Sequence, residues 1–344
     1  MNQQVSDKRE QILHRAARIE DTFHRWRERR GRKRGLKTTI IPYAGYGSPG
    51  WTRVLCRVVL TKDDGAGRQR AEKVRGWRSF FSIPVDDREV TITAGDTVQR
   101  VLPDRGGVLD VRIETDFTPG WNTITLKTDD TEPMTAPVFI VDPDANFGII
   151  SDVDDTVMVT ALPRPFLAAW NTFVLDEHAR TPVAGMAVLY DRLSHANPGA
   201  PVIYLSTGAW NVAPTLTRFM ERNMYPRGPL LLTDWGPTRD RWFRSGQEHK
   251  RSSLRRIAEE FPSMKWLLVG DDGQHDEALY GEFSTEHPEN VAAVAIRQLS
   301  TGEAVFAGGR SKAAAHEEGS SVRWFYAPDG AGLYEQLVDA GLAV

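Results

Sequence analysis

The chain has 344 residues, of which 40% are hydrophobic, and a formal net charge of −3. This length exceeds the usual size of a single domain, so two domains of a soluble globular protein are expected. The one cysteine, Cys56, excludes a disulfide within the chain and fits a reducing compartment. No apolar stretch is as long as a membrane span, and the N-terminus is charged where a signal peptide is apolar. These features predict a cytoplasmic location, with peripheral contact on the inner face of the membrane left open.

The first 37 residues are strongly basic. Twelve lysines and arginines stand against five acids, which gives +7 and leaves −10 for the rest of the chain. A seven-residue apolar repeat predicts an amphipathic helix from Ser6 to Arg30, within a basic N-terminal segment of residues 1–36. The repeat consists of Val5, Ile12, Ile19 and Trp26. Either the helix packs on the protein's own body, or it lies on an anionic lipid surface. Nothing in the pattern indicates a nucleic acid, and the pattern defines no oligomeric state.

From Leu36 to Asp142 the hydrophobic pattern has a period of two, as in β-strands. Turn clusters such as PDRGG separate the runs, which is typical of an antiparallel β-sandwich, here expected over residues 37–145. We interpret Gly45 to Gly50 as an ordinary hairpin turn. The region contains no catalytic cluster, so its expected role is scaffolding or recognition. The expected strands are Lys37 to Pro42, Thr52 to Leu60, Trp77 to Ile83, Glu89 to Ile92, Thr97 to Val101, Gly107 to Glu114, Gly120 to Leu126 and Pro137 to Val141.

Beyond Phe147, strand-like and helical segments alternate. This predicts an α/β domain over residues 146–344, with a doubly wound parallel sheet and helices on both faces. Residues 308–320 are expected to form an exposed linker or loop. The expected strands are Gly148 to Ser151, Val202 to Ser206, Pro229 to Leu232, Lys265 to Gly270 and Val291 to Ile296, before a closing segment from Val322 to Tyr326. The expected helices lie around Gly185 to His195, Ala213 to Asn223, His249 to Glu260, Gln274 to Phe283 and Gly332 to Ala340.

Three aspartates, Asp152, Asp154 and Asp155, follow the first strand of this domain in the stretch FGIISDVDDTVMVT. Open α/β sheets place their chemistry at the carboxyl ends of strands. Carboxylates so close together raise one another's pKa unless a cation lies among them, which favours a divalent metal. The same pattern is compatible with a solvated acidic turn or with a calcium loop, although Val157 occupies the position where a calcium loop needs glycine.

Later strands are expected to bring further polar groups to the same crevice. Ser206 begins a Ser-Thr-Gly stretch that suits a phosphate oxygen but is also a common turn. Lys250, near a helix start, can give a point charge to a phosphoryl group, although such lysines are more often solvated. A second acidic cluster at a strand end is hard to explain structurally. It consists of Asp271 and Asp272, with Asp276 one helical turn later.

These four motifs, in this order, resemble those of the haloacid dehalogenase superfamily of phosphatases. The resemblance implies that Asp152 is the nucleophile that attacks phosphorus and that Asp154 is the general acid and base. It also implies that Ser206 and Lys250 hold the phosphoryl oxygens. The implied cofactor is Mg²⁺, and its implied ligands are Asp152, Asp154 through its backbone carbonyl, Asp271, and either Asp272 or Asp276.

The stretches GIISDVDDTVMVT, LSTGAW and VGDDGQHDEALY further resemble the bacterial relatives of the yeast actin-patch phosphatidate phosphatase, the App1 catalytic domain family. This resemblance implies hydrolysis of the phosphomonoester of phosphatidate to diacylglycerol and phosphate through an aspartyl phosphate. The implied partner is an anionic lipid at a membrane surface. The short segments between motifs leave no room for a large cap, so an open cleft is expected. A phosphatase for a soluble phosphomonoester and a non-catalytic interaction module remain alternatives.

Overall fold

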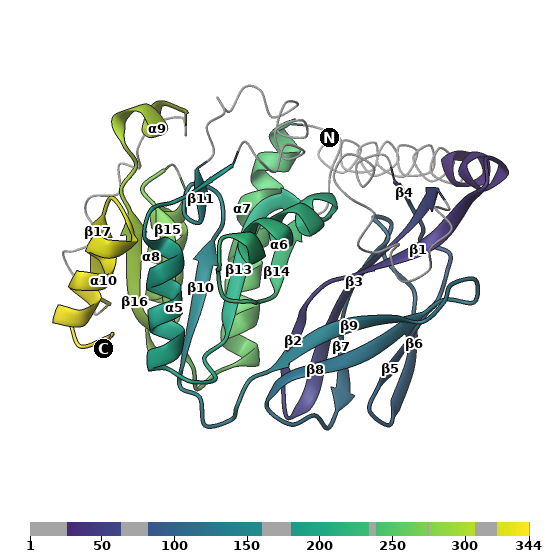
Figure 1. Cartoon of the computed structure of the whole chain (residues 1–344), viewed down its shortest axis with the longest axis horizontal. Helices are drawn as coiled ribbons and strands as arrows, with labels where there is room; N and C mark the ends of the chain where they lie inside the picture. The colour runs from purple at the N-terminus through teal and green to yellow at the C-terminus, as the bar shows by residue number, and fades with distance from the viewer. Residues whose placement is uncertain are drawn as a thin grey trace, which may run out of the picture.

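The computed structural model describes residues 26–62, 82–159, 180–233, 239–273, 275–306 and 322–343, with the backbone alone for residues 239–245. A β-rich region and an α/β region lie side by side, with the β-rich region on the right of Figure 1. Residues 26–33 are helical, where the predicted N-terminal helix ends. The rest of that helix, most of the predicted strand from Trp77 to Ile83 and the linker 308–320 fall outside the described residues. None of the described helices is long and apolar enough to span a membrane.

The strands of the β-rich region are hydrogen-bonded into one sheet. They are β1 (Leu36–Pro42), β2 (Gly45–Ser48), β3 (Gly50–Lys62), β4 (Ile83–Pro84), β5 (Val90–Ala94), β6 (Thr97–Val101), β7 (Val108–Thr115), β8 (Gly120–Lys127) and β9 (Met134–Ile140). Among these described strands, only β2 and β9 pair in parallel. The predicted antiparallel pairing is therefore largely present. The two separate sheets of a sandwich are instead joined through β3, because this 13-residue strand pairs with β1, β2, β4 and β7 along its length.

The predicted turn from Gly45 to Gly50 contains strand β2. A Cβ on Gly45 or Gly47 would collide with a backbone carbonyl of β3, at Arg53 and Trp51 respectively. The glycines are thus required by the close approach of two strands. Because glycine is also typical of turns, the sequence pattern concealed this strand.

The α/β region contains a parallel sheet, as predicted. Its strands, in spatial order, are β14 (Leu230–Thr233), β13 (Val202–Ala209), β10 (Phe147–Asp152), β15 (Lys265–Asp271), β16 (Val291–Arg297) and β17 (Trp324–Ala327). The first strand in the chain is therefore central, and the chain adds strands on one side of it before crossing to the other. This order places the carboxyl ends of β10, β13 and β15 together, where open α/β sheets bind ligands.

Helices connect these strands. They are α5 (Met186–Ala196), α6 (Ala213–Arg222), α7 (Arg239–Glu260), α8 (Asp276–Glu286), α9 (Thr301–Phe306) and α10 (Gly330–Asp339). In Figure 1, α5 lies in front of the parallel sheet and α7 behind it. The prediction that α7 begins at His249 was wrong by about three turns. Gly246, a poor helix former, lies in this early part because the helix passes close to Thr207 there.

Strand β3 is buried on both faces over most of its length, which explains why adjacent residues such as Val54 to Cys56 and Val58 to Leu60 are all apolar. Val54, Cys56 and Val58 belong to the core of the β-rich region. Leu55 and Val59, which point to the opposite face, belong to the cluster that forms the core of the α/β region. One hydrophobic core therefore extends from the α/β region across to β3, and Cys56 fills the other core as expected.

Polar contacts reinforce the contact between the two regions. Glu260 at the end of α7 accepts hydrogen bonds from the Tyr46 hydroxyl at 2.7 Å and from Arg53 Nη2 at 2.5 Å. Asp110 on β7 binds Arg53 and also Arg256 of α7, whose Nη1 donates at 2.8 Å. The side chains of Arg53 and Glu260 are largely buried, so each depends on the other, whereas Arg256 and Asp110 are more exposed.

Glu260→Ala should destabilise the protein. The substitution leaves the Tyr46 hydroxyl and the Arg53 guanidinium without this acceptor, and breaking a buried ion pair costs roughly 3 to 5 kcal/mol. Urea unfolding of the full chain measures the change. The neighbouring exposed residue gives a matched control, Glu259→Ala, which should stay within about 0.5 kcal/mol of wild type. Equal effects of the two substitutions would contradict a stabilising contact between the regions.

Candidate active site

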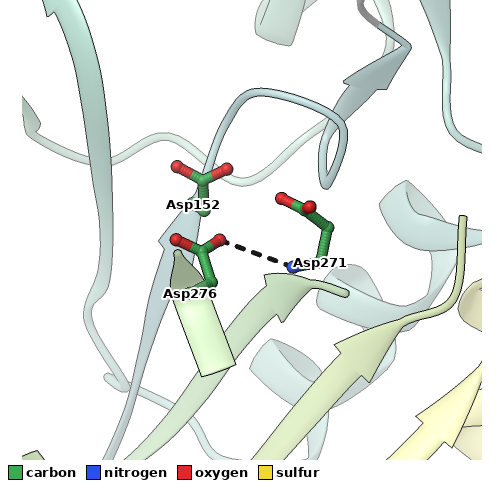
Figure 2. A group of neighbouring side chains, drawn as sticks. All are labelled: Asp152, Asp271 and Asp276. Atoms are coloured by element: carbon green, nitrogen blue, oxygen red, sulfur yellow. Dashed lines mark hydrogen bonds between the residues drawn. The ribbon is translucent and has the colours of Figure 1, made fainter. Parts of the chain in front are cut away.

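Three carboxylates converge where β10 and β15 end. Asp152 is the last residue of β10, Asp271 is the last residue of β15, and Asp276 is the first residue of α8. Figure 2 shows the three side chains close together at the ends of these elements. Each offers an oxygen within 4.8 Å of the others, and all three residues are buried. Oxygen ligands at this spacing suit a hard divalent cation.

Lys250 of α7 is the cation that the structure places against these carboxylates. Its Nζ lies 2.6 Å from Asp152 Oδ1 and 2.7 Å from Asp276 Oδ1. Burial disfavours the ammonium, but the two carboxylates outweigh burial and raise the pKa of Lys250. The sequence predicted Lys250 against a phosphoryl group, and the structure brings it to the crevice in contact with the predicted nucleophile.

Asp154 and Ser206 form a second contact beside the triad. The Ser206 hydroxyl donates to Asp154 Oδ2 at 3.0 Å and accepts from the Gly208 amide at 2.9 Å. Burial raises the pKa of Asp154, although Lys250, the Ser206 hydrogen bond and Arg180 act in the opposite direction. The surroundings therefore favour a protonated Asp154 more than water does.

The charge of the triad fits a bound metal. Burial, followed by repulsion from Asp276, raises the pKa of both Asp152 and Asp271 well above its usual value. One ammonium cannot balance three buried carboxylates. A divalent cation among the oxygens would supply the missing positive charge.

Asp272 has a different role from its neighbours. Its Oδ1 accepts from the Leu299 amide at 2.8 Å, and its own amide donates to the Arg297 carbonyl at 2.9 Å. These bonds tie the end of β15 to the segment after β16. Of the two acids left open by the sequence, the structure therefore places Asp276, and not Asp272, in the triad.

Two arginines near the site were not predicted. Arg297, buried at the end of β16, donates to the carbonyl of Asp155 at 2.7 Å and to Glu303 at 2.7 Å. Asp155 has a φ of 59°, in the left-handed region, so Arg297 anchors a strained turn next to the acids. Arg180, also buried, acts electrostatically on Asp154. Arg297 ends the apolar run VAAVAIR, and a single arginine at the end of such a run could have marked it as a site residue from the sequence. The sequence around Arg180 contains no comparable pattern.

Much of the chain is similar in sequence to known proteins. Residues 147–298 match the family described as phosphatidate phosphatase APP1, catalytic domain. The chain is 28% identical to phosphatidate phosphatase APP1 of Saccharomyces cerevisiae over 243 residues, which cover 67% of this chain and 40% of the yeast protein. It is 27% identical to an uncharacterized protein of Schizosaccharomyces pombe over 153 residues, which cover 44% of this chain and 25% of that protein. The matches thus span less than half the length of these relatives.

The α/β region is therefore similar to a catalytic domain of the phosphatase class. The similarity to the APP1 catalytic domain covers residues 147–298, which include the triad and Lys250. Among solved structures, a carbohydrate acetylesterase from Xanthomonas citri matches with a TM-score of 0.27 and 10% identity, over 77% of this chain and 70% of that one. A likeness this weak carries no argument about fold or function.

Metal binding should distinguish the adjacent acids Asp271 and Asp272. Asp271→Asn removes a charged oxygen from the triad and should weaken binding of Mg²⁺ or Mn²⁺ by at least about tenfold. Asp272→Asn keeps an oxygen that can accept from the Leu299 amide and should bind these ions like wild type. Calorimetric titration of the full chain measures both. Equal weakening in the two variants would contradict the assignment of the triad.

Proposed function

We propose that this chain is a Mg²⁺-dependent phosphatidate phosphatase with a doubly wound, haloacid dehalogenase-like catalytic domain. The observation that carries the proposal is the convergence of three buried carboxylates and Lys250 at the carboxyl ends of adjacent parallel strands. This convergence lies within the region that matches the APP1 catalytic domain. We keep residues 1–36, 37–145 and 146–344 as the proposed division of the chain.

Asp152, Asp271, Asp276 and the backbone carbonyl of Asp154 would hold the metal. When bound, Mg²⁺ supplies positive charge that reduces repulsion between a carboxylate nucleophile and a phosphate. Asp152 then attacks phosphorus through a carboxylate oxygen, and the phosphorus bond to the lipid oxygen breaks. Lys250 favours the ionised form of Asp152 against its burial, and its remaining ammonium proton can face a phosphoryl oxygen.

Asp154 is placed to move protons in both half-reactions. Ser206 occupies its Oδ2, while its Oδ1 is buried and has no hydrogen-bond partner among the described residues. Protonated Asp154 gives its proton to the departing alkoxide, and the resulting carboxylate takes one from the water that hydrolyses the aspartyl phosphate. The raised pKa of Asp154 matches the first of these tasks.

An exposed basic cluster supports a lipid surface as the place of action. Arg29, Arg30, Lys33, Arg34 and Lys37 are exposed around the end of the N-terminal helix. Glu28 and Gly31 are buried between them, and Gly31 lies against Leu60 and Ile83, so this part of the helix is held on the β-rich region. The helix thus packs on the body and still presents positive charge to an anionic membrane, which suits a cytoplasmic enzyme with peripheral contact.

Turnover of phosphatidate in mixed micelles tests the proposal. The kcat/KM for phosphatidate should exceed the kcat/KM for glycerol 3-phosphate by at least about a hundredfold, because remote binding energy from the lipid contributes to catalysis. Asp152→Asn should lose at least about a thousandfold on both substrates, because an amide cannot attack phosphorus. The exposed Asp144 provides a control, Asp144→Asn, which should match wild type. Faster turnover of the soluble ester would favour the alternative of a soluble substrate.

The basic cluster should govern attachment to vesicles and not chemistry. Replacing Lys33 and Arg34 with Gln removes two exposed charges, each of which contributes roughly 1 kcal/mol near an anionic surface. Binding to phosphatidate-containing vesicles, measured by sedimentation, should weaken by about thirtyfold, and turnover of a soluble ester should not change. The control replaces the exposed Lys127 and Lys265 with Gln. An equal loss in this control would refute a specific role for the cluster.

A further inference from the structure

The turn that follows β10 is held from two sides by side chains of other elements. Within the turn, the Asp155 amide donates to the Met158 carbonyl at 2.8 Å. The Tyr225 hydroxyl, from the segment before β14, donates to the Val157 carbonyl at 2.8 Å. Arg297, the last residue of β16, donates to the Asp155 carbonyl at 2.7 Å. Hydrogen bonds from distant segments therefore fix the path of the chain just beyond the strand that carries the triad residue of β10.

The guanidinium of Arg297 is itself held in one orientation, because each of its three nitrogens makes a hydrogen bond. Besides the bond from Nη1 to the turn, Nη2 donates to Glu303 Oε1 at 2.7 Å and Nε donates to the Pro328 carbonyl at 3.3 Å. The Arg297 side chain is only 7% exposed. A planar guanidinium fixed by partners in α9 and after β17 offers Nη1 at a single place, and the Asp155 carbonyl must lie there to accept from it.

The turn needs such a hold because the backbone of Asp155 is in an unfavourable conformation. Its φ of 59° lies in the left-handed region, where the Cβ of an L-residue crowds the following carbonyl oxygen. The residue before it, Asp154, carries the carboxylate that Ser206 contacts. Asp152 of the triad lies only two residues further back. A relaxation of the backbone at Asp155 would therefore move Asp154 relative to the triad.

We propose that Arg297 is a positioning residue of the metal site, because its bond to the Asp155 carbonyl keeps the left-handed turn that presents Asp154 to the cation. This role rests on the proposed metal-dependent function. The direction of its effect distinguishes positioning from simple electrostatics. Loss of a positive charge beside the acids would by itself strengthen cation binding, whereas loss of the positioning bond weakens it. Residues that orient metal ligands typically change metal affinity by about tenfold or more.

The test removes Arg297 without leaving the Glu303 carboxylate uncompensated. The double variant Arg297→Met, Glu303→Gln deletes both charges of the pair, so the local net charge is unchanged and the fold should survive, which urea unfolding checks. Calorimetric titration of the full chain with Mn²⁺ should show binding at least about tenfold weaker than in wild type. The control is Arg323→Gln, which should bind Mn²⁺ like wild type. Arg323 Nη1 also donates to a backbone carbonyl, that of Ala340 at 2.8 Å, but at the amino end of β17, away from the triad.

Substitutions of Asp155 test whether the turn carries the effect. Glycine adopts the left-handed region freely and alanine does not, while both substitutions remove the same carboxylate. In the double variant, Asp155→Gly should therefore bind Mn²⁺ at least about fivefold more tightly than Asp155→Ala. Equal affinity of these two would overturn the turn as the route of the effect.

The binding of Mn²⁺ separates this inference from the proposed function. Unchanged or tighter binding in the double variant, with wild type binding the ion, would overturn the positioning role of Arg297 and leave the metal site standing. A wild-type chain that binds neither Mn²⁺ nor Mg²⁺ would overturn the proposed metal site, and the role of Arg297 with it.

Discussion

The sharing of one buried ammonium by two buried carboxylates constrains the rest of the α/β region. Lys250 contacts both Asp152 and Asp276, which belong to different elements. An ammonium removed from water is tolerated only when its partners surround it, so α7, the end of β10 and the start of α8 must meet at one point. The excess negative charge that remains suits a divalent cation, which would also reduce the repulsion between these carboxylates and a phosphate ester.

Strand β3 joins the β-rich region to the α/β region. Because its alternate residues enter two cores, the β-rich region cannot separate from the α/β region without exposing apolar surface. The ion pairs of Glu260 and Asp110 lie around the same contact and connect it to α7. The helix that carries Lys250 is therefore fixed at its carboxyl end by the β-rich region and near its middle by the triad. A change at the contact between the regions can reach the site through a single rigid element.

The sequence predicted what depends on local pattern. The strands that deliver Asp152 and Asp271 were clear, because each is a short apolar run that ends in acids. Contacts between distant segments were not predictable. The parallel pairing of β2 with β9 and the anchoring of Asp155 by Arg297 join residues far apart in the chain. Neither periodicity nor composition carries such information, and the glycines of β2 produced a misleading turn signal.

The choice between Asp272 and Asp276 shows why spacing alone could not complete the site. Both acids follow β15 closely, so sequence separation favours neither. Asp276 opens α8, where unpaired amides and the helix dipole favour a negative charge, and its carboxylate turns back toward the end of β15. Asp272 instead satisfies the amide of Leu299, and moving it into the triad would leave that buried donor without its acceptor. The cost of an unmade hydrogen bond therefore gives the two acids different tasks. Asp276 faces the ammonium of Lys250, and Asp272 ties the end of β15 to the segment after β16.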